Sequence, residues 1–177
     1  MRYVAEHCRR SGLPLMAIDL GYSSHSASCS IMHEGLRVPL TVHFGECIDV
    51  SVERIRRCGD LILVIEGVLS TYHNPQGDPE IRGAFERGMG WYYGPGAVTY
   101  AAALRFLTQL HRRIRTRATV YLAEAFVSFK KQRISHADDA LLIYRNFHRV
   151  PVERLVPGTQ PILKIIEGVP PVRVFRR

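Results

Sequence analysis

Three stretches decide the fold of this chain: LMAID at residues 15–19, LILVIE at residues 61–66 and VYLAE at residues 120–124. Each is a run of apolar residues without alternation, which is typical of a strand covered on both faces of a sheet. Each ends in a carboxylate, Asp19, Glu66 or Glu124. Because the C-terminal ends of parallel strands meet at one edge of an α/β sheet, these acids are expected to share a site.

Chance explains this pattern poorly. Asp and Glu account for 16 of the 177 residues. With three candidate positions at each strand end, three acid-tipped strands arise by chance with a probability on the order of 0.02. For one acid alone, a strand-end carboxylate that meets water is about as good an explanation as a functional one. The three together favour a site.

Composition sets the class of protein. A chain of 177 residues, 46% hydrophobic and 23% charged, fits one globular domain with extensions, and it contains no apolar run of the ~18 residues that a membrane span needs. The N-terminus has no apolar stretch that could act as a secretory signal, so the expected location is the cytoplasm, with no membrane partner. The four cysteines have neither metal-binding nor disulfide-framework spacing.

Periodicity and turn signals predict an α/β fold with the order βββαβαβα. The first three strands are expected to form an antiparallel meander, and the first, fourth and fifth strands are expected to be parallel because helices connect them. The expected strands are 15–20, 27–32, 37–44, 61–66 and 118–124, and the expected helices are 49–57, 97–110 and 134–147.

The order of elements divides the chain into three parts. An N-terminal extension covers residues 1–13, the main domain 14–149, and a Pro-rich C-terminal extension 150–177. Within this last extension, residues 162–166 are expected to form either an extra edge strand or the contact of a homodimer.

The charge indicates a polyanionic partner, and nucleic acid, DNA in particular, is the expected one. The formal net charge is +8 and the pI is about 9.7. The long connection 68–96 should hang over the acidic site, and its aromatic residues could stack on bases or simply pack the loop. The candidate nucleic-acid-binding residues are Arg112, Arg113, Arg115, Lys130, Lys131, Arg133, Trp91, Tyr92 and Tyr93. For each basic cluster, a solvated surface is the alternative.

The motifs resemble a known superfamily. The sequence has Asp19 within AIDLG, Glu66 at the end of the fourth strand and HADDAL at residues 136–141. This set resembles the RNase H-like superfamily, and within it RuvC-type Holliday-junction resolvases. EAFVSF at 124–129, followed by HADDA, is also similar to an uncharacterised family of predicted RNase H-like nucleases. The resemblance implies a mixed sheet with helices on both faces. RuvC-type enzymes have a longer segment before the last helix, which here is only 125–135.

The resemblance also implies a chemistry, the hydrolysis of phosphodiester bonds with two Mg²⁺ or Mn²⁺ ions. Asp19 would bridge both ions, Glu66 and Asp139 would each complete one side, and Glu124 or Asp138 would be supporting or alternative ligands. His136 shares a helix face with Asp139 and would orient or deprotonate the attacking water. Ser135 and Asp138 also have the spacing of a capping box, which is sufficient to explain Asp138.

The expected function is therefore a metal-dependent endonuclease that cleaves branched or partly single-stranded DNA. Two alternatives stay open, a non-catalytic nucleic-acid-binding or scaffold protein of the same fold and an RNA-processing nuclease. Asp19-Leu20-Gly21 followed by YSSHS also resembles the phosphate-binding turn of actin-type and sugar-kinase-type ATP-binding proteins. Those proteins need two such domains, and this chain has room for one.

Overall fold

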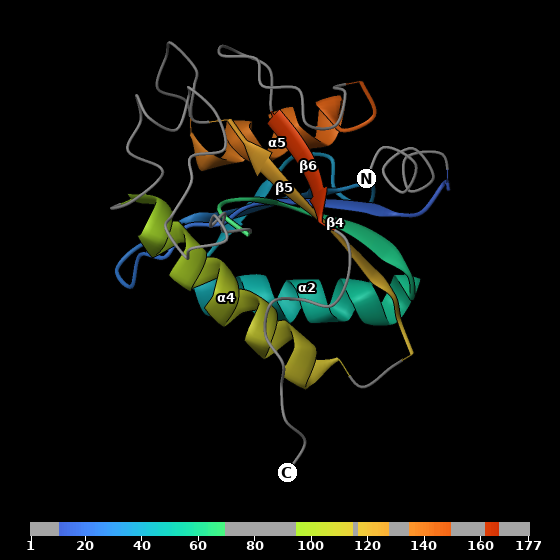
Figure 1. Ribbon diagram of the computed structural model, residues 1–177, viewed down its shortest axis with the longest axis horizontal. Coiled ribbons are helices and arrows are strands. Elements are labelled where there is room, and N and C mark those ends of the chain that lie inside the picture. The colour runs from blue at the N-terminus through green and yellow to red at the C-terminus, as the bar shows by residue number, and fades with distance from the viewer. Residues whose placement is uncertain (1–10, 70–94, 115–116, 128–134, 150–161, 167–177) are drawn as a thin grey trace, which may run out of the picture.

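The computed structural model describes residues 11–69, 95–114, 117–127, 135–149 and 162–166. In this part of the chain, three helices cover the two faces of one six-stranded mixed sheet (Figure 1). None of the helices in the described segments is long and apolar enough to cross a bilayer.

The sheet has the strand order β3-β2-β1-β4-β5-β6. Strand β1 pairs in parallel with β4, and β4 pairs in parallel with β5, while β1, β2 and β3 form an antiparallel meander. Both arrangements were predicted from the sequence and are confirmed. The strands are β1 (Leu15–Asp19), β2 (Cys29–His33), β3 (Leu40–Val42), β4 (Leu61–Glu66), β5 (Val120–Phe126) and β6 (Ile162–Ile166).

Strand β6 is the extra edge strand that was one of two predictions for residues 162–166. It pairs antiparallel with β5, in a register that joins Glu124 to Lys164 and Phe126 to Ile162. The C-terminal extension therefore contributes a strand to the sheet of the main domain. The homodimer stays a prediction.

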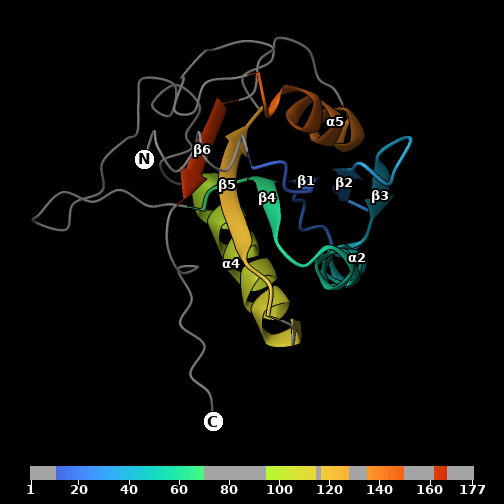
Figure 2. The same ribbon diagram turned by 90° about the vertical axis from the view of Figure 1, so that its right-hand side faces the viewer.

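The helices form two layers around the sheet (Figure 2). Helices α2 (Phe44–Cys58) and α4 (Pro95–Arg113) pack on one face, and α5 (His136–Asn146) covers the other. Side chains of β1 alternate between the two layers, as a strand buried on both faces requires: Met16 and Ile18 belong to the α2/α4 core, whereas Leu15 and Ala17 belong to the α5 core. The unalternating apolar runs are thus explained by burial on both faces.

The boundaries of α2 and β3 differ from the predicted ones, because local contacts decide where these two elements begin and end. Helix α2 begins at Phe44 rather than at residue 49, and there the Glu46 carboxylate accepts a hydrogen bond of 2.9 Å from the backbone N–H of His43. It ends at Cys58, and the next residue, Gly59, has a φ of 72°, a conformation that favours glycine. Strand β3 is shorter than predicted at both ends: it begins after Pro39, which has no N–H to donate, and it ends before His43, the N-cap of α2.

Candidate functional site

Two of the predicted acids lie side by side at the C-terminal edge of the sheet. Asp19 is the last residue of β1, Glu66 is the last residue of β4, and the two are direct partners in the parallel register. Alternation along each strand places both on the α5 face, since Ala17 and Val64, two residues before them, belong to the α5 core. Asp19 is 3% exposed, so its carboxylate is held in a largely desolvated position.

Helix α5 brings two further predicted residues to the same place. His136 Nδ1 lies 2.8 Å from Asp19 Oδ2, and because an ionised carboxylate can only accept, the imidazole donates this hydrogen bond. Asp139 follows one turn later and is 7% exposed. The sequence spacing i, i+3 had predicted that His136 and Asp139 share a helix face. The first residue of α5 is therefore joined to a strand 117 positions earlier in the chain.

The electrostatics of this cluster act on His136. Its hydrogen bond to Asp19 raises the pKa of the imidazole, and the negative charges of Asp19, Glu66 and Asp139 raise it further. Partial burial opposes this by lowering the pKa, but the net effect favours the protonated imidazolium. Three carboxylates and one imidazole thus form a single electrostatic unit on the α5 face of the sheet edge. We call this set, Asp19, Glu66, His136 and Asp139, the carboxylate cluster.

Glu124, a predicted metal ligand, is placed on the other face of the sheet. It pairs with Ile65 rather than with Glu66, so it is one residue out of phase with the other strand-end acids. Its neighbours Ala123 and Ala125 belong to the α5 core, which leaves the Glu124 side chain on the side of α2 and α4. It is fully buried there. The prediction that all three strand-end acids share a site is therefore wrong for Glu124 in this arrangement, because a strand reverses its side-chain direction at every residue.

Asp138 has the capping role that the sequence predicted. Its carboxylate accepts hydrogen bonds from the backbone N–H of Ser135 at 3.1 Å and from the Ser135 hydroxyl at 2.7 Å, while Ser135 Oγ accepts from the Asp138 N–H. Ser135 is the N-cap of α5. This capping box fixes the start of the helix, and it thereby positions His136, the next residue, beside Asp19.

The turn after Asp19 depends on a close approach between Gly21 and Ser28. A Cβ atom at residue 21 would lie 2.1 Å from the Ser28 carbonyl oxygen, so only glycine fits. The Ser28 hydroxyl accepts a hydrogen bond of 3.1 Å from the Ser23 N–H, and the Cys29 thiol donates to the Gly21 carbonyl at 3.1 Å. These contacts hold the C-terminal end of β1, and hence Asp19, against β2.

One polar residue beside the site was not selected from the sequence. Ser30 is fully buried and is the direct antiparallel partner of Asp19 on β2. Its hydroxyl lies 2.8 Å from Thr41 Oγ1 on β3. The only signal in the sequence was a serine within an otherwise apolar strand, which is too common a feature to identify a site.

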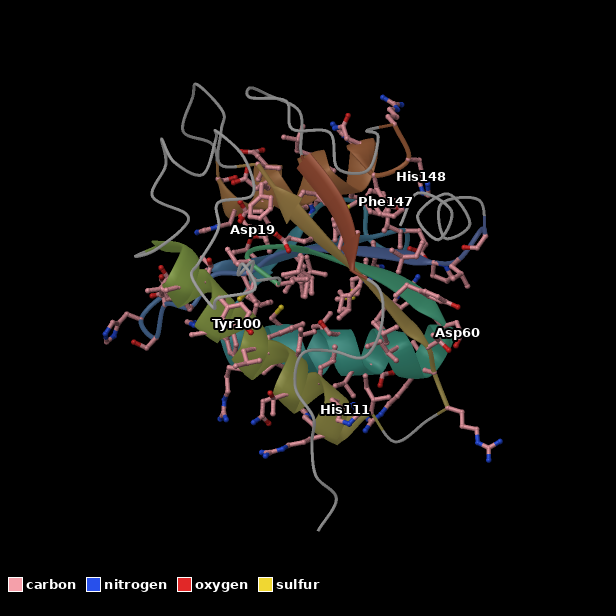
Figure 3. The ribbon with its side chains drawn as sticks, viewed as in Figure 1. Asp19, Asp60, Tyr100, His111, Phe147 and His148 are labelled. Carbon is pink, nitrogen blue, oxygen red and sulfur yellow. The ribbon has the colours of Figure 1, made fainter. Side chains whose placement is uncertain are left out.

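The predicted nucleic-acid contacts are only partly within the described structure. Arg112 and Arg113 are exposed at the C-terminal end of α4, and Arg113 forms an ion pair of 2.5 Å with Asp49. Figure 3 shows His111, their neighbour, far from Asp19, because α4 runs back toward the N-terminal edge of the sheet. The remaining candidates lie outside the described residues: Trp91, Tyr92, Tyr93, Arg115, Lys130, Lys131 and Arg133.

The donor set suits a hard cation, but its side chains do not converge on one point. In the segments that the structure describes, no group of three or more His, Cys, Asp or Glu side chains is close enough to hold a metal ion. The chemistry of the carboxylate cluster nevertheless fits Mg²⁺ or Mn²⁺, since Asp19, Glu66 and Asp139 offer oxygen ligands on one face of the sheet edge.

Comparisons with models of protein families, with curated proteins and with solved structures find no match to this chain. What the fold and site define is an α/β protein with a mixed sheet and a cluster of acids at the ends of two parallel strands.

Proposed function

We propose that this chain is a metal-dependent nuclease of the RNase H-like class that hydrolyses phosphodiester bonds in branched or partly single-stranded DNA. The observation that carries the proposal is the carboxylate cluster, in which Asp19 and Glu66 are in-register partners and Asp139, on α5, acts with them on the charge of His136. The proposal is also supported by the strand order β3-β2-β1-β4-β5, in which β1, β4 and β5 are parallel and β2 is antiparallel to both of its neighbours.

The metal would be held by Asp19, Glu66 and Asp139, with Mg²⁺ or Mn²⁺ as the cation. Two such ions would stabilise both the attacking and the leaving oxygen of an in-line displacement. The protein's own contribution is to keep the acids together in spite of their repulsion: Asp19 is anchored at the end of a buried strand, and Asp139 is anchored by the capped start of α5.

His136 would act on a proton in this mechanism. Its hydrogen bond to Asp19 orients the ring, and the raised pKa of His136 favours the protonated form in the absence of metal. An imidazolium can donate a proton to a leaving oxygen, whereas the neutral ring can take one from water. Which of these roles operates depends on the charge that the bound cation would add to the cluster.

A non-catalytic nucleic-acid-binding or scaffold protein is the second candidate. Two observations favour it. No three acidic, histidine or cysteine side chains of the described residues lie close enough together to hold a metal ion, and Asp19 already forms an ion pair with His136. In such a protein His136 would neutralise the charge of the buried Asp19 and would contribute only to the stability of the fold.

The test is cleavage of a panel of labelled substrates by wild-type protein, Asp19→Asn and Glu53→Gln in Mg²⁺. The panel contains a four-way junction, a fork, a duplex, a single strand and the corresponding RNAs. Glu53 is an exposed carboxylate on α2 and serves as the matched control. A metal ligand stabilises the transition state by several kcal/mol. Its loss in Asp19→Asn should therefore slow cleavage at least about 100-fold, whereas the cleavage rate of Glu53→Gln should be unchanged.

Each outcome decides between the candidates. Cleavage by Asp19→Asn at the wild-type rate would remove Asp19 from the proposed metal site. Tight binding without cleavage of any substrate by the wild-type protein would favour the scaffold. Cleavage confined to the RNA substrates would identify an RNA-processing nuclease.

A further inference from the structure

A hollow of the surface lies at the other end of α5 from the carboxylate cluster. It is an open cleft of about 470 Å³ between the start of β1 and the end of α5, and it is lined by Leu13, Leu15, Tyr144, Arg145, His148 and Arg149. Helix α5 has 11 residues and is therefore about 16 Å long. In Figure 3, Asp19 and His148 accordingly lie well apart, so the cleft is a separate place on the molecule.

One side of this distal cleft is cationic. Arg145, His148 and Arg149 are all exposed, and none of the carboxylates in the described segments forms an ion pair with Arg145 or Arg149. Both guanidinium groups line the same hollow, so both would attract an anion bound there. Guanidinium groups bind phosphate oxygens with two parallel hydrogen bonds, which makes phosphate the anion that suits them best.

The rest of the lining of the distal cleft is apolar. Leu15 is 6% exposed at the start of β1, and both Leu13 and Tyr144 pack against the α5 core. The ring of His148 makes a T-shaped contact with the buried Phe147 ring, with centroids 4.9 Å apart. Apolar side chains such as these can pack against a planar ring, and an aromatic ring such as that of Tyr144 can stack on a nucleic-acid base.

Charge alone would not identify a ligand here, because basic residues at a helix C-terminus are also favoured by the helix dipole. The dipole does not account for a hollow that those residues line together with apolar side chains. A cleft of about 470 Å³ falls within the range of sites that hold small molecules, and its lining combines apolar side chains with charged ones.

We propose that the distal cleft binds a nucleoside monophosphate unit, with the phosphate on Arg145, His148 and Arg149 and the base against Leu13, Leu15 and Tyr144. The unit comes either from a free nucleotide or from the phosphorylated 5′ end of a strand, which share this chemistry. The site is independent of phosphodiester cleavage, since it uses none of the residues of the carboxylate cluster.

The experiment is calorimetric titration with AMP, adenosine and inorganic phosphate, in EDTA and at low salt. Wild-type protein is compared with Arg145→Gln/Arg149→Gln and with the matched control Arg37→Gln/Arg105→Gln, which removes two exposed arginines outside the cleft. We expect one AMP per chain, bound at least about ten-fold more tightly than adenosine or phosphate. The cleft variant should lose at least about ten-fold in affinity, and the control should lose none.

A second arm separates the two sources of the ligand. An oligonucleotide labelled at its 3′ end is titrated with and without a 5′-phosphate. A gain in affinity from the phosphate that disappears in Arg145→Gln/Arg149→Gln assigns the cleft to strand ends, whereas a response to AMP alone assigns it to free nucleotides.

Two results would overturn the proposal. One is an affinity for AMP that is no higher than the affinity for phosphate. The other is a loss of AMP affinity in the control variant as large as the loss in the cleft variant. Asp19→Asn should bind AMP as the wild type does, so a failure of the nuclease proposal would leave this result unaffected and the two can be distinguished.

Discussion

Replacing Asp19 by Asn should change the stability of the metal-free protein in a pH-dependent way. The substitution keeps the bulk of a side chain that is 4% exposed, but it removes the charge that pairs with His136. Because this pairing raises the pKa of His136, the pair stabilises the fold fully below the pKa of an unfolded histidine, about 6.5. The contribution is lost as the pH rises through the higher pKa of the folded state.

The size of the effect follows from the exposure of the two partners. The His136 side chain is 52% exposed, so water screens the pair. Its contribution to the free energy of unfolding is therefore that of a surface ion pair, about 0.2–1 kcal/mol. The buried Asp19 favours the upper end of that range. At high pH the imidazole is neutral, and Asp19 is then a buried charge near Glu66 and Asp139. There Asn should be at least as stable as Asp, because it relieves this repulsion.

The assay is urea unfolding of the wild type and Asp19→Asn in EDTA at about pH 5.5 and about pH 8.5. We expect the wild type to be more stable by about 1 kcal/mol at the lower pH, and the difference to vanish or reverse at the higher pH. A titration of His136 followed by NMR should show its pKa falling in the variant. A stability difference that is the same at both pH values would refute the assignment of the Asp19–His136 pair.

Three further predictions test the local structure. Asp138→Ala should destabilise the protein by about 1 kcal/mol in urea unfolding through loss of the capping box, and a complete loss of cleavage with an unchanged α5 would instead make Asp138 a ligand. Gly21→Ala should cost about 3 kcal/mol in thermal or urea unfolding because its Cβ meets backbone at Ser28; an unchanged stability would contradict this close approach. Glu124→Gln should retain cleavage in Mg²⁺ while Glu66→Gln loses it, since the two lie on opposite faces, and equal losses would return Glu124 to the site.

The sequence by itself determined the elements and most of their arrangement. Unalternating apolar runs mark strands buried on both faces, and the helices between them make the parallel pairing of β1, β4 and β5 predictable. The pairing of His136 with Asp139 on one helix face and the capping box of Asp138 also follow from spacing within a few residues. These features are local, and so their physics is contained in neighbouring residues.

Only the tertiary structure decided which residues meet. The parallel register sets Glu66 beside Asp19 and puts Glu124 one residue out of phase, on the opposite face, which no periodicity within a single strand reveals. The contact between His136 and Asp19 joins positions 117 residues apart, and the distal cleft joins the start of β1 to the end of α5. Such contacts depend on how whole elements pack against one another, because side-chain direction and register are settled by burial on both faces of the sheet at once.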